Sequence, residues 1–307
     1  MLNFIVRRLM VAIPTLVLLI VISSVIMHAA PGNPFSSEKS LPPAVQANIE
    51  KKYGLDKPLY EQTWNYLVGI VTKFDFGPSF RYKDKTVNEL IAESFPVTLT
   101  YGLIAFVVAV VVGVSLGVFA ALNQNGWLDF STQGLAIGGQ ILPNFVMAPI
   151  LVLIFTVTLG WLPGGGWEGG QPRFIVMPVI ALATSYLASI ARITRSSMIE
   201  VMHSNFIRTA RAKGLPFRYI VLRHALKPAF LPVLSYLGPT FVSMVTGSVI
   251  VDSFFSTGGI GIYFVNSALS RDYSVLMGVT ILLGALTILF STIVDILYAW
   301  IDPKIRY

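Results

Sequence analysis

The amino-acid sequence predicts an all-α, polytopic membrane protein with six transmembrane helices and a small helical segment outside the membrane. Composition supports this prediction first. Hydrophobic residues make up 54% of the 307 residues and charged residues only 12%, which is about half the charge of an ordinary soluble domain. The chain also has no cysteine, which excludes disulfide frameworks, cysteine-ligated metal centres and thiol catalysis.

The second observation is that the apolar residues gather in six runs that are long enough, or nearly so, to cross a bilayer. These runs cover residues 9–30, 97–122, 131–159, 174–191, 229–251 and 273–301. The first is longer than the apolar core of a signal peptide, so we expect it to remain as a span. The fourth is the shortest, and a re-entrant segment is the alternative there. Asp295, in the sixth, is interpreted as interfacial or paired with a basic side chain rather than as an ion-coupling residue.

The third observation is the distribution of lysine and arginine, which predicts the orientation. With the N-terminus inside, Arg7 and Arg8, eight basic residues between positions 192 and 227, and Lys304 with Arg306 lie on the cytoplasmic side. The short outer loops then hold only Arg173 and Arg271. We therefore expect both termini in the cytoplasm, an N-terminal span over residues 1–30, an outer segment over 31–96 and a five-helix core over 97–307.

The outer segment is charge-balanced and reads as a small helical cap. Residues 43–53 form one expected helix, and Pro58 marks the start of a second. Five apolar residues are expected on one face of the second helix: Tyr60, Trp64, Leu67, Val68 and Val71. Thr86 and Glu89 have the spacing of a capping box ahead of the second span. The cap is either a lid that packs on the bundle or a docking surface for an external partner.

The inner segment, residues 192–227, has eight basic residues and one acid, Glu200, and is too short to fold alone. Asn205 is expected to cap a short helix that runs through Lys213, with Gly214 as its stop. Helical spacing places a narrow stripe on one face, with Arg208 and Arg211 beside it; the stripe consists of Phe206, Thr209, Ala210 and Lys213. The segment either sets the membrane topology and contacts anionic lipid, or acts as a peg that inserts into a groove on a cytoplasmic protein.

Two patterns match catalytic or nucleotide-binding motifs by letter, but they lie in segments where those motifs cannot form. Gly113, Ser115 and Gly117 spell GxSxG, but inside an uncharged span they indicate close helix packing rather than a nucleophile elbow. The glycines at 164, 166 and 169 follow a span instead of a strand and indicate an outer turn. No GxxxxGK[ST] motif occurs. We therefore expect no enzyme activity and no cofactor on this chain, and any energy for uphill transport enters from a partner.

Several stretches of the sequence resemble the binding-protein-dependent ABC transporter permeases, in the branch that imports peptides. The inner segment contains NFIRTARAKGL from position 205 and RHALKPAFLPV from position 223, which are similar to the loop by which these permeases contact their ATPases. Further matches are APGNPF, YGLDKPLYEQ, FGPSF, NSALSRDY and DPKIRY. The resemblance covers essentially the whole chain and is to the first of two homologous membrane subunits. In place of the family's Glu-Ala-Ala stand Arg208, Thr209 and Ala210, which leaves no glutamate for a salt bridge at that point.

The resemblance implies a type I importer permease fold in a bacterial inner membrane. It implies as partners a second homologous permease subunit, two cytoplasmic ATP-binding subunits that hold ATP and Mg, and an extracytoplasmic peptide-binding protein, with lipid around the chain and no nucleic acid. The implied ATPase-coupling helix comprises Asn205, Phe206, Arg208, Thr209, Ala210, Arg211, Lys213 and Gly214. Uncharged polar residues that can line a peptide path are Gln140, Asn144 and Ser243.

The expected function is therefore ATP-driven import of oligopeptides by a non-catalytic membrane subunit. Dipeptides, nickel chelates or another small solute are alternative cargoes. A self-sufficient channel or ion-coupled carrier is the alternative from another class, and an intramembrane hydrolase that depends on Ser115 is a third, weakened by the lack of a histidine base in the bundle.

Overall fold

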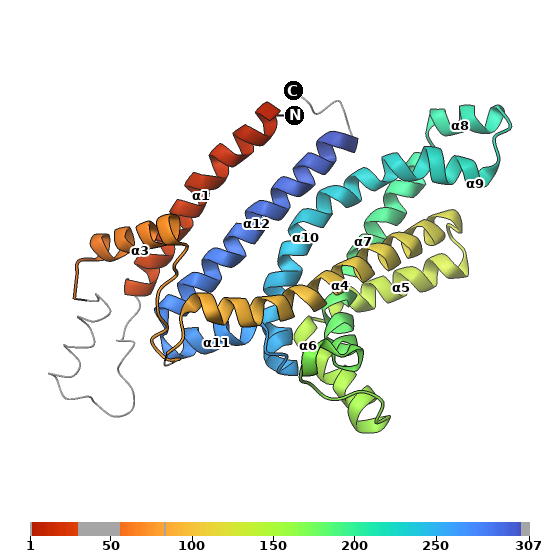
Figure 1. Cartoon of the computed structure of the whole chain (residues 1–307). Coiled ribbons are helices and arrows are strands. Elements are labelled where there is room, and N and C mark those ends of the chain that lie inside the picture. The colour runs from red at the N-terminus through yellow and green to blue at the C-terminus, as the bar shows by residue number, and fades with distance from the viewer. Residues whose placement is uncertain (1, 30–55, 83, 302–307) are drawn as a thin grey trace. The chain divides into compact units, whose positions relative to one another are not determined.

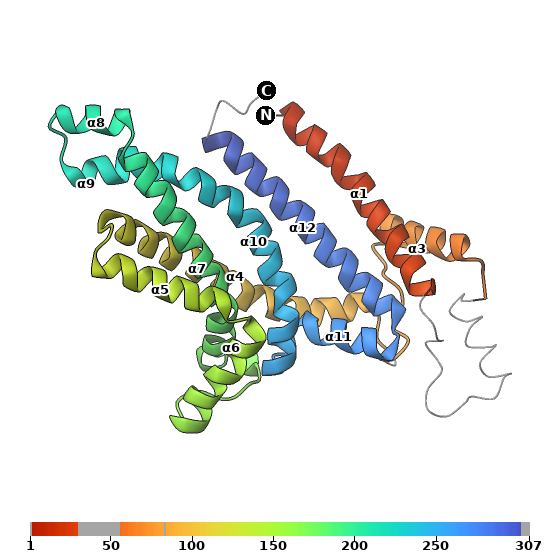
Figure 2. The same ribbon diagram turned by 180° about the vertical axis from the view of Figure 1, so that it is seen from behind.

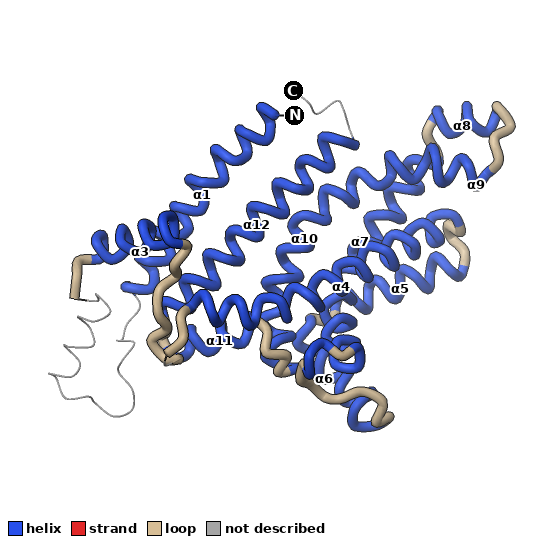
Figure 3. Tube along the Cα trace, in the orientation of Figure 1, coloured by secondary structure: helices blue, strands red, loops and turns tan. Residues whose placement is uncertain are grey.

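The computed structural model describes residues 2–29, 56–82 and 84–301. Within these ranges the chain consists of helices and loops, without a strand (Figure 3). The chain divides into two compact units, one of Leu99–Thr257 with Leu289–Tyr307 and one of Leu2–Thr98 with Gly258–Ile288. Two long helices, α4 (Val87–Leu122) and α12 (Tyr273–Ile301), contribute to both units.

Among the described residues, four helical stretches are long and apolar enough to cross a membrane: Val87–Leu122, Pro172–Met202, Phe217–Phe255 and Tyr273–Leu297. The second, fourth and fifth predicted spans lie in the first three, and most of the sixth lies in the last. The fourth belongs to an unbroken helix of 31 residues, α7 (Pro172–Met202), although its apolar run seemed short. The first predicted span lies in α1 (Leu2–Ala29), whose apolar part extends over Met10–Ile26 among the described residues.

The third predicted span, over residues 131–159, is not one straight helix but a bent pair, which fits either a broken span or a re-entrant segment. The chain there forms α5 (Trp127–Ile141), α6 (Asn144–Leu151) and a π-helical turn, η1 (Val152–Thr158), and the axis bends by 104° between α5 and α6. Pro143 causes the break, because a proline disfavours helical geometry in the residue before it, and Leu142 is accordingly extended with φ −82° and ψ 109°.

In the first unit, α7 packs against α5, α6 and α10 (Leu226–Phe255), as Figure 1 shows. It also approaches α4 closely. A Cβ atom on Gly113 would lie 2.9 Å from Ile190, and one on Gly117 would lie 2.5 Å from the carbonyl oxygen of Ala191. Ser115, between these glycines, donates its hydroxyl to the carbonyl of Val111 in its own helix. The interpretation of GxSxG as a packing motif is thus confirmed.

The second unit is built from α1, α3 (Leu59–Lys73), α11 (Ile260–Ser270) and the first parts of α4 and α12. The predicted capping box is confirmed: the backbone N–H of Thr86 donates to Glu89 at 2.8 Å, and that of Glu89 donates to the Thr86 hydroxyl at 3.2 Å. α4 then runs for 36 residues, about 54 Å at 1.5 Å per residue, so it extends well beyond roughly 30 Å of hydrocarbon.

The predicted second helix of the outer segment is α3, and its packed face differs from the expected one. Leu67, which was predicted to pack, contacts the core of the second unit together with Tyr66 and Ile70. The other four predicted residues, Tyr60, Trp64, Val68 and Val71, are exposed. The expected helix over residues 43–53 lies outside the described residues.

A buried carboxylate, Asp272, joins the loop after α3 to the start of α12. Its Oδ2 atom accepts the Ser79 hydroxyl at 2.5 Å and the backbone N–H groups of Phe80 and Arg81 at 3.1 and 3.2 Å. Its Oδ1 atom accepts the N–H of Val275 at 3.3 Å, as an N-cap residue does. Asp272 therefore holds together segments that are far apart in the sequence.

Candidate functional site

The short helix predicted in the inner segment is α8 (Asn205–Ala212), at the tip of a hairpin whose arms are α7 and the stretch from α9 (Phe217–Tyr219) through the π-helical η3 (Ile220–Ala225) to α10 (Figures 1 and 2). Its N-cap is Ser204 rather than the predicted Asn205, which is the first helical residue. The Ser204 hydroxyl turns back and donates to the carbonyl of Val201 at 2.6 Å. The start of α8 is thus fixed by the preceding turn.

The C-terminus of α8 is a Schellman motif, in which two backbone bonds close the last turn over a left-handed residue. The N–H of Gly214 donates to the carbonyl of Arg211 at 2.9 Å, and the N–H of Leu215 to that of Ala210 at 3.4 Å. Gly214 has φ +71°, a region that glycine adopts without strain. The predicted stop at Gly214 is confirmed.

One face of α8 is buried against other helices of the chain, and this burial was not predicted. Ile207 is fully buried and Ala210 nearly so, in a cluster with Ala121, Met198, Ile220, Val221, Ala225 and Ala229. The predicted stripe is therefore not one face, because Ala210 points inward while Phe206, Thr209 and Lys213 are exposed. The apolar pair at 207 and 210, three residues apart, is the sequence signal that was missed.

The exposed surface of α8 combines cations with an aromatic ring. Arg208, Arg211 and Lys213 are exposed, and Phe206 is half exposed. Thr209 lies roughly opposite Ile207 on the helix, since successive residues are 100° apart. α8 contains no acid. This surface suits a partner groove with acidic groups around an apolar floor, whereas the face with Ile207 and Ala210 anchors the helix to its own chain.

A buried ion pair lies in the first unit, and sequence reasoning missed it. Arg195 donates from Nε to Asp129 Oδ1 at 2.5 Å and from a terminal nitrogen to Oδ2 at 2.6 Å. Asp129 also accepts from the N–H of Asn125 at 2.9 Å and the amide of Gln133 at 3.1 Å. Its side chain is 1% exposed and that of Arg195 is 18% exposed, so the pair joins α5 to α7 away from water.

The ion pair was missed for two reasons. Asp129 lies just ahead of the predicted third span, and Arg195 was assigned to the cytoplasmic segment 192–227, whereas α7 continues to Met202. The signal available in the sequence was that Asp129 is the only acid between Glu93 and Glu168.

The three polar residues proposed to line a path, Gln140, Asn144 and Ser243, lie near the break between α5 and α6 or on α10. The Ser185 hydroxyl of α7 donates to the Asn144 side chain at 3.4 Å and to the carbonyl of Leu142 at 3.3 Å. The next residue of α7, Tyr186, is hydrogen-bonded to Ser243. Asn144 and Ser243 are thus joined through adjacent residues of α7. Gln140 is exposed at the end of α5.

A second carboxylate that the sequence analysis passed over, Asp252, is buried near the end of α10. It accepts the phenolic hydroxyl of Tyr101 at 2.5 Å and the hydroxyl of Thr257. The glycine-rich turn packs beside it: the N–H of Gly166 donates to the carbonyl of Phe255 at 2.7 Å. A Cβ on Gly165 would lie 2.4 Å from the same oxygen, so this turn requires a glycine. Its interpretation as a turn rather than a nucleotide motif is confirmed.

Two protein families match the sequence. The family described as binding-protein-dependent transport system inner membrane component matches residues 113–307. The family of the corresponding N-terminal membrane component matches residues 1–102. Together they cover both compact units and include the hairpin that carries α8.

Individual relatives extend over the whole chain. The sequence is 59% identical over 307 residues to the oligopeptide transport system permease protein OppB of Salmonella typhimurium, with 100% of both chains covered. It is 41% identical to the dipeptide transport system permease protein DppB of Bacillus subtilis, with 100% of this chain and 98% of that protein covered. Among solved structures, the MetNI methionine ABC transporter in an inward-facing conformation matches with a TM-score of 0.59 and 17% identity, over 70% of this chain and 97% of that chain. This last likeness shows the fold.

Proposed function

The chain belongs to the family of binding-protein-dependent transport system inner membrane components, and from this premise we propose that it imports oligopeptides as one membrane half of an ATP-driven transporter. The similarity to OppB over the full length supports oligopeptides as the cargo. The lower identity to a dipeptide permease makes dipeptides the second candidate. The chain itself is a multi-pass membrane subunit.

The observation that carries the proposal is the construction of α8. A helix that is anchored by Ile207 and Ala210 and presents Phe206, Arg208 and Arg211 outward can transmit force, because its inner face is packed into its own chain. We propose that it docks in a groove of a cytoplasmic ATPase, which holds ATP and Mg. ATP binding then draws the two docking helices of a permease pair together and opens the bundle outward, and hydrolysis resets it.

The proposed assembly contains a second homologous permease, two ATP-binding subunits and an external peptide-binding protein. The termini lie in the cytoplasm, and residues 1–30, 31–96 and 97–307 are an N-terminal span, an outer segment and a permease core. Asn144 and Ser243, with Ser185 and Tyr186, offer uncharged hydrogen-bonding groups on α6, α7 and α10. Such groups suit a peptide backbone, which is common to cargoes of unrelated sequence.

Gly214 provides the test. A Cβ at this position meets nothing within 4 Å, so any effect of a substitution comes from the left-handed backbone, with φ +71°. Gly214→Val should lose most peptide uptake in the reconstituted complex while the chain still inserts, since a β-branched residue is strained there and the last turn of α8 must open. Gly214→Asn, which tolerates this backbone, is the control and should retain most uptake.

Wild-type uptake by Gly214→Val would contradict the role of α8. A separate measurement tests the class of function: the chain alone in liposomes should show no peptide flux, and flux without ATPase subunits would favour a channel or an ion-coupled carrier.

A further inference from the structure

Helix α3 has three faces, and one of them is apolar and uncovered. Its packed face contacts the core of the second unit through Tyr66 and Ile70. About 130° further round the helix, Trp64 and Val71 are 66% and 78% exposed. The remaining face is polar and includes Asn65 and Thr72. A helix with an exposed apolar face next to a polar face is typical of a helix that lies in a membrane interface.

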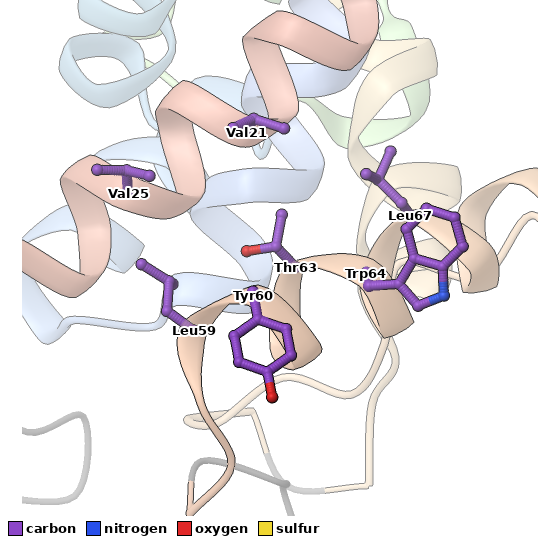
Figure 4. Close-up of a pocket in the computed structure, with 7 residues that line it drawn as sticks. All are labelled: Val21, Val25, Leu59, Tyr60, Thr63, Trp64 and Leu67. Carbon is purple, nitrogen blue, oxygen red and sulfur yellow. The ribbon is translucent and has the colours of Figure 1, made fainter.

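The uncovered face of α3 continues into a groove that it shares with α1. Figure 4 shows Val21 and Val25 of α1 on one side, and Tyr60, Thr63 and Trp64 of α3 on the other. The groove holds about 520 Å³ and its lining is almost entirely apolar. On α1 the surface beyond the groove is apolar as well, since Ile22 and Ile26 are 47% and 63% exposed. The groove thus joins the exposed apolar side of α1.

The depth of α3 along α1 is fixed by a hydrogen bond. The hydroxyls of Ser24 and Thr63 lie 2.7 Å apart, and the apolar run that contains Ser24 ends in the sequence at Ala30, six positions further on. Six residues at helical rise correspond to about 9 Å. Interfacial amphipathic helices bury their apolar face by about 5–10 Å, so α3 crosses α1 at the depth that such a helix requires.

We propose that α3 lies in the membrane leaflet at the C-terminal end of α1, with Trp64, Val68 and Val71 among acyl chains, and that a phospholipid acyl chain fills the groove between α1 and α3. Tyr60 and Trp64 support lipid as the occupant, because amphipathic aromatic rings favour the level of the headgroups. The charges at the N-terminal end of α3 pair with each other: Lys57, which precedes the helix, and Glu61, in its first turn, form an exposed ion pair at 2.6 Å. The proposal rests on the membrane-spanning character of α1 and is independent of the cargo.

The absence of cysteine allows a direct test in the native background. Val71→Cys and Thr72→Cys place a nitroxide label on neighbouring exposed positions of the apolar and the polar face. The full chain is reconstituted into liposomes of phosphatidylethanolamine and phosphatidylglycerol, and the collision rates of each label with oxygen and with a water-soluble nickel chelate are measured. Oxygen concentrates in hydrocarbon, so the ratio of oxygen to nickel collisions should be severalfold higher at Val71→Cys than at Thr72→Cys.

Each other outcome overturns the proposal. Frequent nickel collisions at Val71→Cys would place the face in water. Low rates with both reagents would mean that protein covers it, and if this occurred only with the partner subunits present, the face would be a protein interface.

The groove is tested separately by fluorescence in lipids that carry bromine on the acyl chains. The quenching of Trp64 is obtained as the difference between the bromine-dependent loss of tryptophan fluorescence in the wild type and that in Trp64→Phe. Bromine near the glycerol end should quench Trp64 more strongly than bromine at the chain end, and equal emission with and without bromine would exclude an acyl chain there. The nitroxide pair decides the placement of α3 even if Trp64→Phe fails to fold.

Discussion

Replacing Arg195 by methionine should destabilise the chain substantially. The substitution keeps much of the side-chain volume but leaves the buried Asp129 carboxylate without its cation. Removing one partner of a buried pair typically costs about 3–5 kcal/mol. Asp129 keeps its bonds from Asn125 and Gln133, so we expect the lower end, about 3 kcal/mol. At about 2–4 °C per kcal/mol for chains approaching this size, the midpoint should fall by about 6–12 °C.

The assay is thermal unfolding of the purified chain in detergent, followed by circular dichroism, in a double-mutant cycle. Asp129→Asn combined with Arg195→Met should recover much of the loss, because no unpaired charge is then buried. The control is Arg173→Met, which removes an exposed partner of Glu168 at 3.2 Å and should cost less than about 1 kcal/mol. The reasoning is refuted if Arg195→Met melts like Arg173→Met, or if the double variant is as unstable as the sum of the single ones.

Two further predictions concern packing and the outer loop. Gly117→Ala should lower the melting temperature by forcing α4 away from Ala191, at a cost of about 1–3 kcal/mol. The control is Gly134→Ala on α5, where a Cβ meets nothing within 4 Å, and it should be neutral or stabilising. Equal changes in melting temperature for the two variants would exclude close packing as the cause. Asp272→Asn should loosen the loop that it holds, so trypsin should cut after Arg81 faster than in the wild type, and unchanged cleavage would show that the loop is held by other contacts.

Local signals in the sequence predicted local structure well. The sixth span was predicted to begin at 273, where α12 begins, because Asp272 and the following apolar run mark the start. The capping box at Thr86 and the stop at Gly214 depend on residues within one turn of each other, so spacing alone was sufficient. These features require no knowledge of the rest of the chain.

Features that depend on distant residues were missed or misjudged. Hydropathy summed over residues 131–159 contains no information on the direction of the helix axis, so the bend of 104° at Pro143 was not predicted. Asp129 and Arg195 are 66 positions apart, so the isolation of Asp129 in the sequence does not identify Arg195 as its partner. The inward orientation of Ile207 follows from the hairpin beneath α8, which exists only once α7 and η3 have packed together.

Helix α7 is continuous and connects two regions of the molecule that differ in chemistry. Its 31 residues extend over about 46 Å. Ser185 and Tyr186 touch the polar groups of the bundle, and Met198 touches the base of α8. Because hydrogen bonds stiffen every turn between them, the helix must tilt or slide as a whole. A tilt of about 5° would displace its far end by about 4 Å, which is about three quarters of the 5.4 Å pitch of a helical turn. In the proposed transporter, the polar groups of the bundle and the docking helix α8 can therefore influence each other mechanically without any residue that belongs to both.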